Sequence, residues 1–409
     1  MAGHRYAVLF AVTVAVLGGV AAPAACDMKG EPQMERVLDH LQVIDFAAGR
    51  QTGETAPLAE RMQFHGVPGV SMVVINGTAV GWSHASGVLK AGESAPVTDR
   101  SVFQAGSVSK FVTAVLVLRL ADEGVLDLDA DVNMYLTSWK VPDNEFTAAA
   151  KVTLRNLLSH QGGMPSFPQL DQEAGRPDPT LAQLLRGERP ALNPPAAPCR
   201  EPGSEWAYSN IGYAVIQQVL EDATGRPLQR LADELLFEPL GMNSSSFTYP
   251  LAAELQPLEA WPHDSQGQPR PAEQEGPARA VGGLMTTPDD MAKLVLEVMG
   301  AYQGDAARVI SPEAARLMVT RQVKMPDDAL GLPLSDGLGV FIDDTTDEVC
   351  FLHPGHSSPG TVFVVIAYPA LGHGAVIAAN GNVGDRLYLE IIAALSQEYG
   401  WPSGRPYDR

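Results

Sequence analysis

The distribution of strand-like segments most constrains the fold of this 409-residue chain, because they occur near both ends and leave a long middle. Residues 67–75 and 79–82 are rich in β-branched residues and flank Asn76-Gly77, a pair typical of a tight hairpin turn. Three further apolar segments follow near the end, at residues 349–352, 361–368 and 374–379. Strands at both ends with helices between them indicate one domain interrupted by an insertion.

The middle of the chain has helical character instead. The segment 111–120 is apolar on nearly all sides and ends before Gly124, which predicts a buried helix. Further helices are predicted at residues 58–64, 154–160, 213–223, 228–236 and 386–399. We therefore expect a discontinuous α/β domain of residues 45–121 and 288–409, with a helical domain of residues 122–287 inserted into it.

Residues 1–25 have the form of a secretory signal peptide. Arg5 precedes an uncharged stretch rich in Ala, Val and Leu, and small residues follow just before Cys26. The alternative is an uncleaved membrane anchor, since the stretch is close to the about 20 residues that span a bilayer. We expect an exported protein, periplasmic or secreted, with lipidation of Cys26 as a further alternative and no other attachment to a membrane.

The acidic composition excludes one class of partner. The chain has 28 Lys and Arg against 48 Asp and Glu, a net charge of −20, which would repel the phosphates of nucleic acids. Three cysteines are too few for a disulfide scaffold. If Cys26 is removed or lipidated, Cys199 and Cys350 are left, either as a disulfide pair or as separate thiols.

Ser107 and Lys110 carry the clearest indication of chemistry. They are one helical turn apart and share a face, and a cation at a helix start is disfavoured by the helix dipole. An amine can take the proton of a serine hydroxyl, and backbone amides at a helix start can stabilise an oxyanion. The alternative is that Ser107 caps the helix and Lys110 extends to solvent, and for an isolated pair this would be the default.

Around this pair the chain resembles the penicillin-recognising serine hydrolases, which include class C β-lactamases, D-alanyl-D-alanine carboxypeptidases, family VIII esterases and D-aminopeptidases. Ser107-x-x-Lys110 is similar to their nucleophile motif, and Tyr208-Ser209-Asn210 to their Tyr-x-Asn motif. Other landmarks of the group are similar to residues 152–164, 237–242, 282–290 and 353–355. The resemblance implies an α+β, β-lactamase/transpeptidase-like fold of three layers, an antiparallel sheet flanked by helices with an inserted all-helical domain.

The resemblance also implies a mechanism, an acyl-enzyme formed on Ser107. Lys110 and Tyr208 would share the proton of the hydroxyl, and which of them accepts it stays open. Asn210 would orient Lys110 and bind substrate, and the backbone amides of Ser107 and His356 would form an oxyanion hole. The structural alternative for residues 208–210 is a turn before a helix, with Asn210 as the cap.

His353-Pro354-Gly355 stands where β-lactamases have Lys-Thr-Gly, and it is expected to bind substrate. It departs from that pattern, because His353 replaces a fixed charge with a partial, pH-dependent one and Pro354 has neither hydroxyl nor amide hydrogen. We predict a serine hydrolase acting on a β-lactam, a D-amino-acid amide or an ester. One alternative is a carboxylesterase or D-aminopeptidase without useful β-lactamase activity, and another is a non-hydrolytic penicillin- or peptidoglycan-binding module.

A zinc site is the weaker chemical interpretation. Cys350, His353 and His356 recur at intervals of three, and zinc accepts such ligands together with Cys199. The turn expected at Pro354-Gly355 and the lack of a companion cluster argue against it, so we expect no metal and no cofactor. The substrate would be a small molecule or a peptidoglycan fragment. The remaining histidines are expected to be structural or on the surface, among them His65, His84, His160 and His263.

Overall fold

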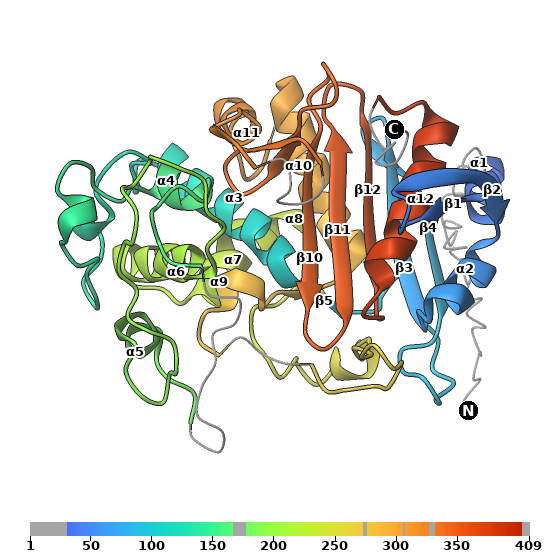
Figure 1. The fold of residues 1–409 in the computed structure, drawn as a ribbon, viewed down its shortest axis with the longest axis horizontal. Helices are drawn as coiled ribbons and strands as arrows, with labels where there is room; N and C mark the ends of the chain where they lie inside the picture. Colours follow the sequence, from blue (N-terminus) through green and yellow to red (C-terminus); the bar gives the residue numbers. More distant parts are fainter. Residues whose placement is uncertain (1–30, 167–176, 273–275, 306, 327–331, 403–409) are drawn as a thin grey trace, which may run out of the picture.

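Strands from both ends of the chain form one antiparallel sheet in the computed structural model, which describes residues 31–166, 177–272, 276–305, 307–326 and 332–402. The order of its eight strands is β4-β3-β12-β11-β10-β9-β8-β7 (Figure 1). Their bounds are β3 Gly69–Asn76, β4 Ala79–Gly87, β7 Val323–Lys324, β8 Leu334–Asp336, β9 Phe341–Asp343, β10 Phe351–Ser357, β11 Thr361–Tyr368 and β12 His373–Ala379. The pairing of β3 with β12 joins the two ends, as the strand distribution predicted.

Successive side chains of the strands point to opposite faces of the sheet, and both faces are apolar. In β3, Val73 and Ile75 pack into the core that contains α3 (Ser109–Asp122) and α10 (Pro288–Gln303). Their neighbours Met72 and Val74 pack into a second core on the other face. That core contains α1 (Glu31–Asp39), α2 (Leu58–His65) and α12 (Gly384–Tyr399), so the sheet lies between two layers of helices (Figure 1).

Most of the remaining helices lie beside α3, on the side away from α12, whereas β1 and β2 lie next to α1 and α12 (Figure 1). The helices are α4 Leu154–Leu158, α5 Leu181–Arg186, α6 Asn210–Thr224, α7 Leu228–Ala232, α8 Glu238–Leu240, α9 Arg279–Gly282 and α11 Pro312–Met318. The short strands pair as β1 Leu41–Asp45 with β2 Arg50–Ala56, and β5 Phe103–Gln104 with β6 Met285–Thr286. The predicted helices are confirmed in position, although the one predicted at 228–236 changes at Asp233 into a π-helical turn. The domain boundaries stay a prediction.

Strand β10 corrects one expectation. The turn expected at Pro354-Gly355 is wrong, because β10 continues through both residues and Pro354 lies opposite Val364 of β11. The other neighbour, β9, pairs only with Phe351 and Leu352, so the rest of β10 has one open edge. A proline is tolerated at such an edge, where a missing amide costs no ladder hydrogen bond.

The structure decides between the two alternatives left open for Cys199 and Cys350. Cys199 and Cys350 are not joined by a disulfide, since Cys350 is buried at the start of β10 while Cys199 is exposed in a loop beside Gly163. The predicted signal peptide and Cys26 lie outside the described residues. Within the described part of the chain, no helix is long and apolar enough to cross a membrane.

Candidate active site

Ser107 lies in a 3-10 turn, Gly106–Val108, that leads directly into α3. Gly106 has a φ of 52°, and a Cβ there would lie only 2.7 Å from the carbonyl oxygen of His356. A Cβ at Gly355 would likewise collide with the carbonyl of Ala105. The two glycines therefore let the turn that carries Ser107 rest directly on the backbone of β10.

The hydroxyl of Ser107 lies between an amine and a phenol. Lys110 Nζ donates to Ser107 Oγ at 3.0 Å, and Tyr208 Oη donates to the same atom at 2.9 Å. The alternative in which Ser107 caps the helix and Lys110 extends to solvent is wrong, because no side chain caps the start of α3 and Lys110 is fully buried. The structure thus brings together the three residues predicted to be catalytic.

Lys110 is a buried cation without a carboxylate partner among the described residues. Its Nζ donates to the carbonyl of Val281 at 2.7 Å, in addition to its contact with Ser107. It also lies 5.1 Å from the centre of the Tyr208 ring and 5.6 Å from that of Tyr213, within the range of cation–π attraction. Its described partners are all neutral groups, so no counter-charge holds the amine away from the reacting atoms.

Tyr208 rests on His160, a histidine that the sequence placed among structural or surface residues. The rings of His160 and Tyr208 have centres 4.3 Å apart. On either side of Tyr208, the amide of Ser209 donates to His160 Nδ1 at 3.2 Å and the amide of Ala207 donates to its carbonyl at 2.8 Å. Burial, followed by the charge of Lys110, holds the pKa of His160 well below its usual value, so the ring is neutral and Nδ1 can accept.

Asn210 is the first residue of α6. The helix is capped by Ser209, whose Oγ accepts the amide of Gly212 at 3.0 Å, so the alternative in which Asn210 is the cap is wrong. Asn210 is half-buried, two residues after Tyr208.

His353 differs electrostatically from what the sequence predicted. Its ring is buried, is stacked on Phe341 with centres 5.0 Å apart, and donates from Nδ1 to the carbonyl of Pro354 at 2.8 Å. Burial, assisted by the nearby charge of Lys110, lowers the pKa of His353 to about 3. The expectation of a partial charge is therefore wrong, and at neutral pH this position has no charge with which to bind a carboxylate.

The geometry of β10 separates the histidines of the zinc interpretation. His353 and His356 are three residues apart in β10, so their side chains point to opposite faces of the sheet. His356 is exposed, whereas its backbone contacts the turn at Gly106. In the part of the chain that is described, no three His, Cys, Asp or Glu side chains lie close enough to hold a metal ion.

A cavity of about 520 Å³ opens beside Ser107. Several of its lining residues were not predicted from the sequence. One is Trp206, whose Nε1 donates to the buried Asp336 Oδ2 at 2.7 Å. Burial raises the pKa of Asp336 well above its usual value. The described lining residues are Ser107, Trp206, Tyr208, Met325, Phe341, His353, Pro354, Gly355, His356, Val362, Asp385 and Tyr388. The place of Trp206 two residues before Tyr208 was a usable signal, but Met325 and Phe341 carried none.

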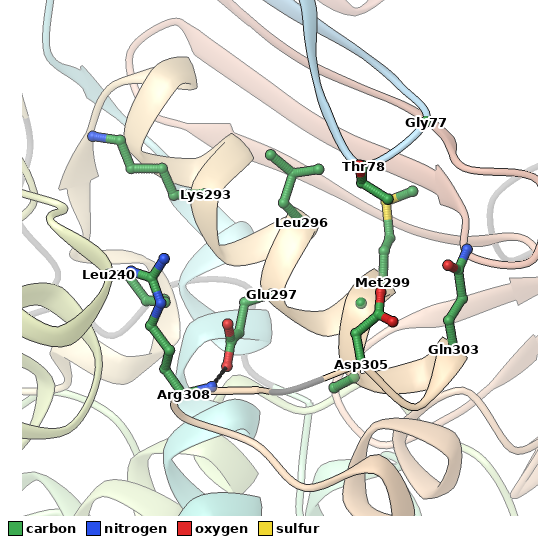
Figure 2. Close-up of a pocket in the computed structure, with 12 residues that line it drawn as sticks. Gly77, Thr78, Leu240, Lys293, Leu296, Glu297, Met299, Gln303, Asp305 and Arg308 are labelled. Atoms are coloured by element: carbon green, nitrogen blue, oxygen red, sulfur yellow. Dashed lines mark hydrogen bonds between the residues drawn. The ribbon is translucent and has the colours of Figure 1, made fainter.

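A second hollow, of about 350 Å³, lies along α10 and the turn between β3 and β4 (Figure 2). Two of its charged groups, Glu297 and Lys293, already have partners within the protein. Glu297 accepts the backbone amides of Arg308 and Val309, and Lys293 Nζ donates to Asp290 at 2.7 Å and to the carbonyl of Gly241 at 2.8 Å. No serine or tyrosine is among its described lining residues, so the cavity beside Ser107 is the candidate active site.

The Ser-x-x-Lys helix packed against strand β10 of an antiparallel sheet defines the class, a penicillin-recognising serine hydrolase with a β-lactamase/transpeptidase-like fold. The chain belongs to the Beta-lactamase family, whose sequence model matches residues 56–397.

Similar proteins support this assignment. The chain is 31% identical to penicillin-binding protein 4 of Amycolatopsis lactamdurans over 343 residues, which cover 82% of this chain and 86% of that protein. It is 31% identical to esterase EstB of Burkholderia gladioli over 213 residues, which cover 50% and 52%. The structure of the octameric penicillin-binding protein homologue from Pyrococcus abyssi has the same fold, with a TM-score of 0.70, 23% identity and coverage of 84% and 76%. The protein is a β-lactamase-related hydrolase.

Proposed function

We propose that this enzyme hydrolyses small esters and amides, D-amino-acid amides included, through an acyl-enzyme on Ser107. The observation that carries the proposal is the hydroxyl of Ser107 between Lys110 Nζ and Tyr208 Oη. For Ser107 Oγ to bond to the substrate carbonyl carbon, either the amine or the phenol must first be deprotonated. That member of the pair would take the hydroxyl proton and then pass it to the leaving group. The amides of Ser107 and His356 would stabilise the oxyanion, and water would then release the acyl group.

The neutral state of His353 supports substrates without a carboxylate, such as esters and amides, over β-lactams. Most β-lactams carry a carboxylate beside the ring, and a neutral imidazole offers no charge to pair with it. The likeness to an esterase points the same way. A small molecule or a fragment of peptidoglycan fits a cavity of about 520 Å³.

A second candidate function is penicillin binding without turnover. The likeness to penicillin-binding protein 4 favours it, because such a protein would be acylated on the same serine. The two candidates differ only in whether water releases the acyl group.

One experiment separates them. Wild type and Ser107→Ala are given a 4-nitrophenyl ester and a chromogenic cephalosporin, and the intact mass is measured after incubation with penicillin. We expect the ester to be turned over much faster than the cephalosporin, and both activities to disappear in Ser107→Ala. A stable penicillin adduct without turnover of either substrate would favour the binding module, and ester hydrolysis unchanged in Ser107→Ala would refute both.

Export through residues 1–25 belongs to this proposal, because peptidoglycan lies outside the cytoplasm. A fusion of these residues to a reporter enzyme that is active only after export tests it. Activity that depends on residues 1–25 is expected, and an inactive fusion would contradict it.

A further inference from the structure

The cavity beside Ser107 has an uneven distribution of charge. Among its described lining residues, Asp385, in the first turn of α12, is the one Asp, Glu, Lys or Arg side chain. Lys110 lies behind Ser107 and is bound to the carbonyl of Val281. Most other walls are apolar or aromatic, contributed by Trp206, Met325, Phe341, Val362 and Tyr388.

The cavity crosses the open edge of β10. His353 lies on the face of the sheet that contains Ser107, whereas His356 lies opposite Val362, on the face covered by α12. Asp385 and Tyr388 belong to that second face. A substrate whose carbonyl carbon is at Ser107 and which extends across β10 therefore ends beside Asp385.

No fixed cation balances Asp385 at this end in the described structure. The neighbouring Arg386 is directed to the ring of Phe46, with its guanidinium carbon 5.3 Å from the ring centre, and it does not line the cavity. The titratable groups that face the cavity besides Asp385 are His353, which is neutral, His356, which is exposed, and the phenols of Tyr208 and Tyr388. The far end of the cavity thus favours a positive charge and disfavours a negative one.

We infer that the site selects its substrates by charge, and accepts esters or amides with an apolar acyl chain that ends in a cationic group. This rests on the function proposed above and adds the substrate class. Because Asp385 is exposed, the attraction is that of a surface ion pair, and we expect a preference of roughly threefold to fivefold over a neutral chain. A chain that ends in a carboxylate should be disfavoured by a similar factor.

The test compares three 4-nitrophenyl esters of similar chain length: 6-(trimethylammonio)hexanoate, heptanoate and the adipate monoester. Wild type should show the highest kcat/KM for the cation and the lowest for the anion. In Asp385→Asn the ratio of the cationic to the neutral ester should fall toward one. The matched control is Asp39→Asn, which makes the same change of net charge at an exposed position at the end of α1.

Each outcome has one meaning. Equal kcat/KM for the three esters in wild type overturns the charge selection while leaving the proposed function intact. The same loss of preference in Asp39→Asn would assign the effect to net charge instead of Asp385. If none of the three esters is hydrolysed and Ser107 forms no adduct, the proposed function fails, and the inference fails with it.

A separate observation concerns His160, the one residue other than glycine with a positive φ, 55°, in the described part of the chain. A left-handed backbone is costly for histidine, and such strain persists where the surroundings require it. This strained residue accepts hydrogen bonds from both neighbours of Tyr208, and its ring packs against the Tyr208 ring. We infer that His160 is a positioning residue that fixes the phenol of Tyr208 at Ser107.

Two variants separate positioning from strain. His160→Gly accepts the left-handed backbone without cost but has no ring and no acceptor. His160→Asn also tolerates this backbone and supplies an amide acceptor near the position of Nδ1. We expect kcat for the ester to fall about tenfold or more in His160→Gly with KM little changed, and to be partly restored in His160→Asn. Wild-type kcat in folded His160→Gly would overturn the inference, and so would an equal loss in both variants.

Discussion

Two basic side chains are buried in the described part of the chain, in opposite surroundings: Arg61 in α2 and Lys110 in α3. Arg61 donates twice to the buried carboxylate of Glu390 in α12, at 2.7 and 2.8 Å, and His65 and the amide of Ile44 contact the same carboxylate. Lys110 contacts only neutral groups in the described part of the chain. The first charge is neutralised and joins α2, α12 and β1, whereas the second remains available for chemistry.

The largest effect should come from removing the available charge. Lys110→Met keeps the length of the side chain but removes the amine, and we expect kcat/KM for a nitrophenyl ester to fall about 10²–10⁴-fold. The thermal midpoint should stay the same or rise, because a buried amine without a carboxylate partner is lost. Acylation of the variant at the wild-type rate, followed by intact mass, would remove Lys110 from its proposed role.

Removing the partner of Arg61 should have the opposite effect, a loss of stability with little change in activity. Glu390→Gln leaves Arg61 buried without its counter-charge, which should lower the free energy of unfolding by about 3–5 kcal/mol. Activity per folded molecule should be close to that of wild type, since Glu390 is not among the residues that line the cavity. Urea denaturation and kinetics on the same sample measure both quantities. A variant of normal stability would show that the ion cluster is not what holds α2 to α12.

The third prediction concerns pH: acid should destabilise the folded protein because His353 is buried as a neutral ring. Because the pKa of His353 is about 3 in the folded protein and near 6.5 when unfolded, the unfolded state binds the proton first as pH falls. The stability contributed by the neutral ring is complete above about pH 6.5 and is lost toward pH 3, by at most about 1.4 kcal/mol per pH unit. In His353→Gln, urea denaturation at pH 7, 6 and 5 should show a shallower slope than wild type. Equal slopes would show that His353 is not neutral in the folded state.

A surface ion pair should have the smallest effect. Arg36 in α1 is bound to Glu398 in α12, but the arginine side chain is half-exposed and its charge is screened by water. Arg36→Ala should leave the denaturation midpoint unchanged within error. A loss as large as that of Glu390→Gln would show that burial is not what distinguishes the two pairs.

What could be predicted from the sequence is local. The spacing of Ser107 and Lys110 and the apolar periodicity of residues 111–120 depend on a few neighbouring positions, and both agree with the structure. The charge of His353 was mispredicted because it depends on Phe341 and Lys110, which are far away in sequence. The strand through Pro354 was missed for the same reason, since the length of β9 decides whether the edge is open.

Other residues of the site could not be predicted because their place there also depends on contacts between distant parts of the chain. Met325 and Phe341 belong to a region of short strands without apolar alternation, and they line the cavity because that region follows β10 in the sheet. His160 looked like any other histidine until its contacts on both sides of Tyr208 were known.

The contact between Gly106 and the backbone of His356 also has a consequence for the order of events in the cell. The nucleophile is translated early, but the strand on which its turn rests belongs to the last part of the chain. A growing chain therefore carries Ser107 without the amide of His356 beside it, and the site is assembled only when β10 joins the sheet. The enzyme would then be inactive during synthesis and during any passage through a membrane in an extended state.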